Sequence, residues 1–311
     1  MAVILALGIV VIAALAVVYV LAGQILVHWI VGWFRKGRPT VMRSQRIYRL
    51  CIVGVTLLSL SCVAYAYFVE PCWLEVTHVC IVTEKMQRGC KPFRLVQISD
   101  LHCCDRVRLE TELPGVIAAQ KPDAIVFTGD AINTPLALGT FKTLMKSLSK
   151  IAPTYAVRGN WDQDRSIDLY GDTGVKELDH EFVHLEAGGS ELYLLGLPAA
   201  LNPQPAALVQ KVPARAFKVL LFHYPEVLGR VQSGQIDLIL SGHTHGGQVA
   251  LPWYGAVYLP TPLGKLLERG LYVQGQTYLY INRGIGMTGS SLAAARFLTR
   301  PEVTVIDITP P

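Results

Sequence analysis

Two long apolar runs open the chain, and shorter apolar runs bounded by polar residues and glycines make up the rest. The first run covers residues 2–34 without a charged side chain, and the second covers residues 50–69. About 20 apolar residues span the ~30 Å hydrocarbon layer of a bilayer, so each run is long enough for a transmembrane helix. The pattern therefore predicts a membrane anchor with two transmembrane segments over residues 1–69.

Two other interpretations of these runs stay open. A signal peptide has a charged segment before its apolar stretch, and none precedes the first run. A buried hairpin of core helices would not share the connector 35–49, which has six basic residues and no acidic one. We therefore expect two retained spans joined by a basic loop, followed by a juxtamembrane segment over residues 70–92.

From residue 93 onward, strand-like runs alternate with helical stretches. Runs of four to seven residues rich in Val, Ile, Leu, Phe and Tyr predict buried strands, and two stretches with helical spacing predict helices. The strands are expected at Phe93–Ser99, Ala124–Thr128, Thr154–Val157, Leu192–Gly196, Phe217–Phe222, Asp237–Leu240, Thr277–Ile281 and Val303–Ile308, and the helices at Arg106–Gln120 and Leu136–Lys150. This alternation predicts an α/β domain over residues 93–311.

Side chains that bind metals follow five of these strands. In an α/β sheet the ligand site lies beyond the carboxyl ends of the strands, so we expect groups at these positions to converge on one crevice. The seven candidates are two aspartates, one asparagine and four histidines: Asp100, His102, Asp130, Asn160, His223, His243 and His245. An ordinary turn would explain any one of them alone, but not five strand ends together.

Seven oxygen and nitrogen donors suit two divalent ions better than one. Two cations about 3.5–4 Å apart can clamp a phosphoryl group, lower the pKa of a bridging water and stabilise the attacking and leaving oxygens. A carboxylate such as Asp130 can bridge the pair. Mixed His, Asp and Asn ligation suits Mn²⁺, which we expect first, with Fe or Zn²⁺ as alternatives. The pattern thus predicts a phosphoester hydrolase.

The same motifs resemble those of the calcineurin-like metallophosphoesterases. The resemblance covers Phe93–Pro311 and rests on the series SDLH, TGD, RGNWD, FHYPE and SGHTHGGQ. The C-terminal stretches YINRGIGM and RPEVTVI are similar to the membrane-tethered bacterial branch of that family. The resemblance implies a β-sandwich flanked by helices. It also implies a first ion on Asp100, His102, Asp130 and His245, and a second on Asp130, Asn160, His223 and His243.

One position departs from the family pattern. The histidine that usually follows the asparagine is replaced by Trp161, whose indole donates a hydrogen bond but cannot act as an acid. An alkoxide leaving group needs a proton, whereas a phosphate monoester, with a second pKa of about 6, leaves more readily. The substitution favours a diphosphate or another activated phosphoester. Alternatively, Asp162, Arg158 or Arg283 supplies the missing function, and Arg283 and Arg296 are candidates for gripping phosphate.

Composition and charge limit the function further. Charged residues make up 16% of the chain, where a soluble domain has about 25%. The six charges before Glu70 are all basic, whereas the rest of the chain has 22 basic and 23 acidic residues. A body of net charge −1 lacks the basic surface that nucleic acids require, which argues against a nuclease. A non-catalytic membrane scaffold remains a further alternative, and nothing calls for an obligate protein partner.

Together these observations favour a membrane-anchored, dinuclear metal-dependent phosphoesterase acting on a lipid-linked phosphate. The family resembled includes the lipid A enzymes that hydrolyse UDP-2,3-diacylglucosamine to lipid X and UMP, and their asparagine motif also lacks the usual histidine. That substrate is our first hypothesis, and another lipid phosphate is the alternative. The apolar stretches 131–141, 197–208 and 251–267 either line an acyl-chain groove, enter the membrane, or pack as a lid or core.

The anchor places the chain in the bacterial inner membrane, but the orientation is open. A basic connector over 35–49 should be cytoplasmic, which puts the body outside if both runs cross. A UDP-sugar is cytosolic and requires the body inside. Either the first run does not fully cross, or the substrate is another lipid phosphate.

Overall fold

The computed structural model describes residues 2–34, 43–200, 203–288 and 294–311. The chain divides into two compact units, Met1–Ala66 and Tyr67–Pro311. Most of the basic connector predicted at 35–49 lies outside the described residues.

The first unit consists of two helices. Helix α1 covers Ala2–Phe34 and helix α2 covers Arg43–Ala64, and the Tyr19 hydroxyl of α1 lies 2.9 Å from Ser59 Oγ of α2. Among the described residues, one helix is long and apolar enough to cross a membrane, Ser44–Cys72. The described side chains of α1 form only a shorter apolar stretch. Of the two predicted transmembrane helices, the structure therefore supports one as a candidate.

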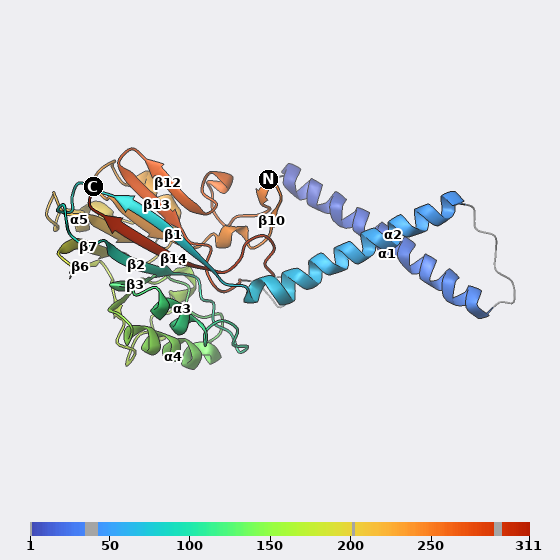
Figure 1. Ribbon diagram of the computed structural model, residues 1–311, viewed down its shortest axis with the longest axis horizontal. Coiled ribbons are helices and arrows are strands. Elements are labelled where there is room, and N and C mark those ends of the chain that lie inside the picture. Colours follow the sequence, from blue (N-terminus) through green and yellow to red (C-terminus); the bar gives the residue numbers. More distant parts are fainter. Residues whose placement is uncertain (1, 35–42, 201–202, 289–293) are drawn as a thin grey trace. The chain divides into compact units, whose positions relative to one another are not determined.

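The second unit is a sandwich of two six-stranded sheets, with helices on its outer faces (Figure 1). The first sheet has, in spatial order, the strands β1 (Glu75–Val82), β14 (Glu302–Thr309), β2 (Phe93–Ile98), β3 (Ala124–Phe127), β4 (Thr154–Ala156) and β5 (Lys176–Glu177). The second sheet has β12 (Gly270–Gln274), β13 (Thr277–Ile281), β9 (Leu238–Ser241), β8 (Lys218–Leu221), β7 (Ser190–Gly196) and β6 (Glu181–Ala187). A small hairpin pairs β10 (Ala250–Leu251) with β11 (Gly255–Ala256). The predicted mixed α/β fold is confirmed.

Apolar side chains fill the space between the two sheets. Leu95, Val126, Val219 and Leu240, from the central strands, belong to this layer and are fully buried. Neighbouring residues of the same strands point the other way, as Phe127 does beneath the helices of the first sheet. Because the central strands are buried on both faces, they appear in the sequence as continuous apolar runs.

Short helices cover the outer faces. Helices α3 (Leu113–Ala119) and α4 (Leu138–Ser149) pack on the first sheet. Helix α5 (Pro205–Val209) and the 3₁₀ helix Pro225–Arg230 contribute to the apolar cluster on the second. Helix α3 is shorter than the predicted Arg106–Gln120 because Pro114 occupies its first turn, a position that suits the start of a helix.

The sequence located the eight interior strands and missed the four edge strands, β1, β5, β6 and β12. Strand β1 lies within the segment 70–92, where only a juxtamembrane link was expected, and it pairs in parallel with β14 from Glu75 to Val82. An edge strand has partly exposed side chains, as most of β1 does, and so lacks the continuous apolar run of an interior strand.

Candidate metal centre

All seven predicted ligands lie where the parallel strands of the two sheets end. The first sheet supplies four residues, which follow β2, β3 and β4, and the second sheet supplies three, which follow β8 and β9. In chain order they are Asp100, His102, Asp130 and Asn160 from the first sheet, and His223, His243 and His245 from the second. Each half of the sandwich therefore provides part of one site.

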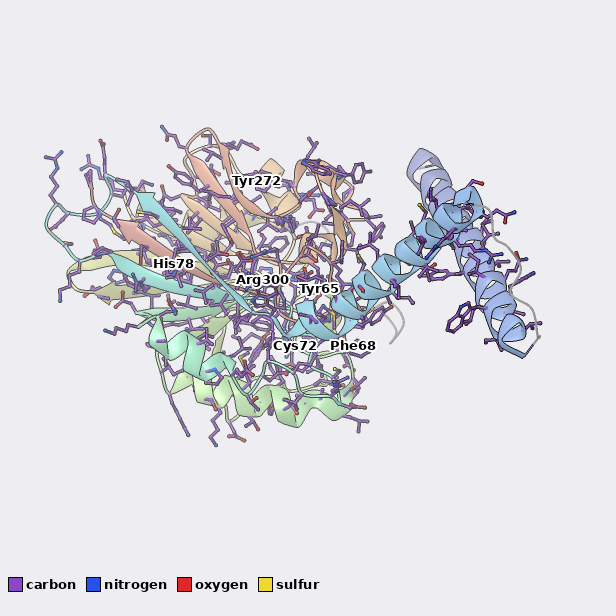
Figure 2. All side chains as sticks on the ribbon, turned by 45° about the vertical axis from the view of Figure 1, so that its right-hand side comes forward. Tyr65, Phe68, Cys72, His78, Tyr272 and Arg300 are labelled. Carbon is purple, nitrogen blue, oxygen red and sulfur yellow. The ribbon has the colours of Figure 1, made fainter. Side chains whose placement is uncertain are left out.

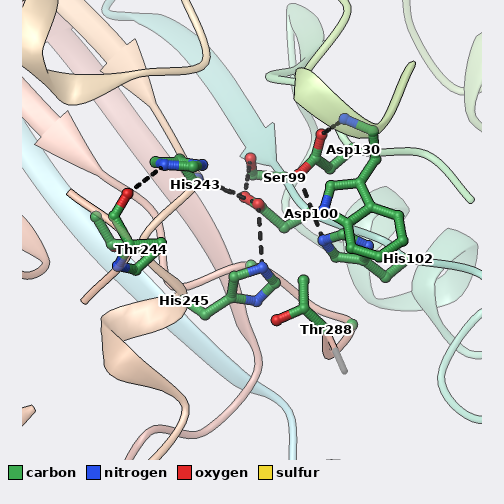
Figure 3. Close-up of polar contacts among 12 residues, drawn as sticks. Ser99, Asp100, His102, Asp130, His243, Thr244, His245 and Thr288 are labelled. Carbon is green, nitrogen blue, oxygen red and sulfur yellow. Dashed lines mark hydrogen bonds and ion pairs between the residues drawn. The ribbon is translucent and has the colours of Figure 1, made fainter. Parts of the chain in front are cut away.

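The first cluster consists of Asp100, His102 and His245 (Figure 3). One potential ligand atom from each residue lies within 4.8 Å of those of the other two. His245 Nε2 is 3.4 Å from Asp100 Oδ1, and the rings of His102 and His245 have centroids 5.0 Å apart. All three residues are buried.

The second cluster consists of Asp130, His223 and His243, whose potential ligand atoms also lie within 4.8 Å of one another. His223 Nε2 is 3.2 Å from Asp130 Oδ2 and 2.9 Å from Asn160 Oδ1, so the asparagine joins this cluster. Asp130 Oδ2 is also 3.4 Å from Nε2 of His102 in the first cluster. Asp130 thus lies between the two clusters, where a bridging carboxylate belongs.

The donors fit divalent ions. His102 Nε2 and both ring nitrogens of His245 are buried and have no hydrogen-bond partner among the described residues, an arrangement that is costly in a protein without a ligand. Two ligand atoms about 2.1 Å from one ion, at tetrahedral or octahedral angles, lie about 3.0–3.4 Å apart. The 3.4 Å separations that join His102 to Asp130 and His245 to Asp100 match this spacing.

Hydrogen bonds behind the ligands orient their rings. His223 Nδ1 lies 2.8 Å from the Thr128 carbonyl oxygen, and His102 Nδ1 lies 2.7 Å from Asn133 Oδ1. The Asn133 amide in turn donates to the Met287 carbonyl at 3.0 Å. Partners of this kind fix the tautomer of a ligating histidine and leave Nε2 for the ion. The sequence analysis missed Asn133, because no local motif marks it within the apolar stretch 131–141.

Five of the seven candidates have left-handed backbone conformations. The φ angles are +49° for Asp100, +41° for His102, +62° for Asp130, +72° for His243 and +52° for His245. Such conformations are unfavourable for residues with a Cβ atom and concentrate at functional sites. The backbone thus turns sharply at each of these strand ends and aims the side chains inward.

Two glycines allow the close approach of the loops around Asp130. A Cβ atom on Gly129, whose φ is +99°, would lie 2.4 Å from the Gly159 backbone nitrogen. One on Gly159 would lie 2.1 Å from Asp130 Oδ1. Glycine at both positions is therefore needed for contact between the two loops.

The electrostatics of the site favour a bound cation. Burial opposes ionisation of Asp130, but the His223 and His102 imidazoles hold the pKa of this carboxyl well below its usual range. Against the effect of burial, Asp130 raises the pKa of His223 to about 10. Burial and the neighbouring His223 lower the pKa of His243 to about 4, and burial and His102 hold that of His245 well below its usual range. His243 and His245 are thus neutral, which is the form of imidazole that binds metals, and the ionised Asp130 attracts positive charge, which the proton on His223 supplies here and a metal ion would replace.

Trp161 and Asp162 have different surroundings. Trp161 is 47% exposed, its ring lies edge-on to His102 with centroids 5.3 Å apart, and its backbone amide donates to Asp130 Oδ1 at 2.9 Å. The buried Asp162 carboxylate accepts the backbone amides of Asp130, Ala131 and Gly159 at 2.7–2.9 Å. Trp161 therefore lies on the open side of the site, while Asp162 positions the loop of the shared carboxylate.

The three arginines considered as catalytic or phosphate-binding residues have partners within the protein. Arg283 pairs with Glu75 at 2.9 Å and Glu302 at 3.2 Å. Arg158 Nε lies 2.8 Å from Glu177 Oε1. The fully buried Arg296 donates to four backbone carbonyls, those of Arg283, Gly284, Gly286 and Thr299. Arg283 and Arg296 thus have structural roles in the C-terminal segment, and the phosphate grip expected of them stays a prediction.

The three apolar stretches predicted near the site have different surroundings in the structure. Residues 131–141 contribute several buried side chains to the core, and two residues of 197–208 lie outside the described part of the chain. The stretch 251–267 is exposed, with Trp253 fully accessible, Tyr258 71% exposed and Leu266 73% exposed. The carbonyl of Pro260, within this exposed stretch, lies 2.8 Å from His243 Nε2, so an apolar surface borders the second cluster.

Comparisons with known proteins agree with this geometry. The family model "Calcineurin-like phosphoesterase" matches residues 93–247. The uncharacterized metallophosphoesterase YkuE of Bacillus subtilis (strain 168) is 34% identical over 259 residues, which cover 78% of this chain and 88% of the relative. Phosphodiesterase YaeI of Escherichia coli (strain K12) is 28% identical over 86% of this chain and 100% of the relative. UDP-2,3-diacylglucosamine pyrophosphatase LpxG of Chlamydia muridarum (strain MoPn / Nigg) is 24% identical over 78% of this chain and 91% of the relative.

The chain therefore belongs to the calcineurin-like phosphoesterase family, and it is a metal-dependent phosphoester hydrolase. The family implies divalent metal ions, for which the structure has two candidate sites.

Replacing the shared carboxylate tests the pair of sites. In Asp130→Ala we expect the bound metal, measured by elemental analysis, to fall from about two ions per chain to fewer than one, and turnover to fall by about a thousandfold or more, because the two sites share this ligand. The exposed Asp179→Ala is the control and should keep both ions. Retention of two ions in Asp130→Ala would contradict the assignment.

The positioning role of Asp162 predicts a smaller effect. An asparagine there presents an NH₂ group to backbone amides that need an acceptor, so Asp162→Asn should weaken metal binding by about 10–100-fold. Metal titration followed by calorimetry measures this change, with Asp164→Asn in the same loop as the control. An unchanged metal affinity would show that Asp162 does not position the ligands.

Proposed function

We propose that this enzyme is a membrane-anchored, dinuclear phosphoesterase that acts on a lipid-linked phosphate. The observation that carries the proposal is the position of Asp130 between two ligand clusters, the second of which adjoins the largely exposed, apolar stretch 251–267 through His243 and Pro260. A polar reaction centre bordered by apolar surface suits a substrate that has both a phosphate and an apolar part.

In this proposal Asp100, His102 and His245 hold one ion, Asn160, His223 and His243 hold the other, and Asp130 bridges them. When bound, the ions polarise the phosphoryl group and lower the pKa of the attacking water. Mn²⁺ is the expected metal, with Fe or Zn²⁺ as alternatives. The protein itself supplies the orientation of the donors and the partly exposed Trp161 at the open side.

Membrane attachment is supported by the helix Ser44–Cys72. Most large apolar side chains of α2 are exposed, among them Leu50, Leu57 and Leu58. Phe68, just beyond the end of α2, is exposed as well (Figure 2). Exposed apolar side chains over such a length are typical of a surface in contact with lipid. We place the chain in the bacterial inner membrane, with the first apolar run as a second span and membrane lipids as its surroundings.

UDP-2,3-diacylglucosamine is the substrate we propose, hydrolysed to lipid X and UMP. The likeness to LpxG supports it, and so does Trp161, which stands where the family usually has a histidine. Trp161 cannot donate a proton as an acid. The polar side-chain atoms of Asp162 and Arg158 are bound to other protein groups, and Arg283 is paired with Glu75 and Glu302 through Nη2. A phosphate leaving group needs protonation far less than an alkoxide does.

A phosphodiester of another lipid is the second candidate. It is favoured by the similarity to the E. coli phosphodiesterase YaeI, which the chain matches over the relative's whole length.

An assay of the detergent-solubilised full chain with Mn²⁺ distinguishes these substrates. We expect kcat/KM for UDP-2,3-diacylglucosamine to exceed that for an alkyl phosphomonoester at least about tenfold, because only the first has a leaving group of low pKa. Asp130→Ala serves as the inactive control. Faster hydrolysis of the alkyl monoester would refute the leaving-group argument, and cleavage of a lipid phosphodiester alone would favour the second candidate.

The side of the membrane gives an independent test. With alkaline phosphatase fused after Pro311, a UDP-sugar substrate predicts an inactive fusion, because that reporter folds only outside the cytoplasm, and a matching fusion to a fluorescent protein should be bright. An active phosphatase fusion would exclude the UDP-sugar and leave an extracytoplasmic lipid phosphate.

A further inference from the structure

A cavity of about 400 Å³ opens beside the second ligand cluster. Asn160 and His243 line one side of it, and much of the remaining described lining is apolar, including Phe222, Val227 and Pro260. Sites for small molecules are of this size and character. The cavity therefore adjoins the place where the proposed reaction occurs and is large enough for one substituent of a phosphoester.

Glu226 is the acid among the described residues of this lining, which also includes the basic Arg230. It lies in the first turn of the 3₁₀ helix Pro225–Arg230, three residues after His223. Its Oε2 atom is buried and has no hydrogen-bond partner in the described part of the chain. The short helix therefore fixes an acceptor close to the ligands, and the protein leaves that acceptor unpaired.

An unpaired buried carboxylate oxygen is costly, and a ligand that donates a hydrogen bond to it removes the cost. The last torsion of a glutamate side chain is soft, so the carboxylate can turn either oxygen toward the cavity. An acyl chain in the same place would leave the carboxylate unpaired and shielded from water. The cavity thus disfavours an acyl chain and favours a group with N–H or O–H donors.

Aromatic side chains narrow the class of ligand. The Tyr224 ring lies 4.6 Å from the His243 ring and 6.0 Å from the Phe222 ring, centroid to centroid. Aromatic walls pack well against flat or ring-shaped groups. With an acceptor at the wall, such a cavity suits a nucleoside, whose base and sugar carry both ring surfaces and donors.

We propose that this cavity binds the nucleoside part of a phosphoester substrate and that Glu226 selects it by accepting a hydrogen bond. The inference rests on the proposed function, since it takes the substrate to carry a second group on the phosphate. It also assigns the apolar part of the substrate to a different surface from this cavity.

Two phosphodiesters with the same leaving group test the inference. 4-Nitrophenyl thymidine 5′-phosphate carries a nucleoside with donors, whereas bis(4-nitrophenyl) phosphate carries a flat ring without them, and both release 4-nitrophenolate. The full chain with Mn²⁺ should prefer the first. In Glu226→Leu the ratio of the two kcat/KM values should fall at least about tenfold, mainly through KM, because the donor loses its partner. Glu226→Gln keeps an acceptor oxygen and should fall between the native chain and Glu226→Leu.

Affinity for thymidine 5′-monophosphate, measured by calorimetry, gives a readout without turnover and should fall at least about tenfold in Glu226→Leu. Glu84→Leu, which replaces an exposed glutamate, is the matched control. It should change neither the ratio of the two kcat/KM values nor the affinity for thymidine 5′-monophosphate. An unchanged ratio and affinity in Glu226→Leu would overturn the inference. Failure of the native chain to hydrolyse either diester would instead count against the proposed function, and the affinity would still test the cavity. If Glu226→Leu does not fold, the same two measurements on Glu226→Gln decide, with an unchanged ratio and affinity again overturning the inference.

Discussion

The buried carboxylate of Asp130 connects the two halves of the site. Its Oδ2 atom lies 3.4 Å from Nε2 of His102, which follows a strand of the first sheet, and 3.2 Å from Nε2 of His223, which follows a strand of the second sheet. The loop that carries it is held from behind by Asp162, whose carboxylate accepts the Asp130 amide. Because each ligand cluster draws on both sheets, neither can form until the apolar layer between the sheets has closed. Folding of the sandwich and assembly of the site are therefore the same event.

The arginines considered for the site are bound to other groups of the protein. Arg283 and Arg158 are paired with glutamates, and the guanidinium of Arg296 is occupied by backbone carbonyls. The body has one more acid than bases, so its own side chains leave little positive charge for a phosphate at the site. In the proposed enzyme that charge comes from the ions, which neutral imidazoles and ionised carboxylates are suited to hold.

An exposed apolar stretch and a cavity with a buried acceptor adjoin each other beside the second ligand cluster. The stretch 251–267 presents exposed aromatic and aliphatic side chains, including Trp253 and Tyr258. The cavity beside His243 contains instead the unpaired acceptor of Glu226. A lipid-linked nucleotide has the same division, with an apolar part that remains near the membrane and a polar part that enters a pocket.

The sequence by itself determined the interior strands and the seven residues at their ends, because continuous apolar runs and strand-end motifs are local features. Edge strands such as β1 could not be predicted from the sequence, because their partly exposed side chains do not form a continuous apolar run. Only the tertiary structure decided the partners of the charged groups. Arg283 meets Glu75 across 208 positions of the chain, and Asp162 meets the Asp130 amide across 32. Glu226 likewise became notable only when folding buried its carboxylate without a partner. Contacts between residues distant in the chain depend on how the sheets pack, and no local pattern encodes them.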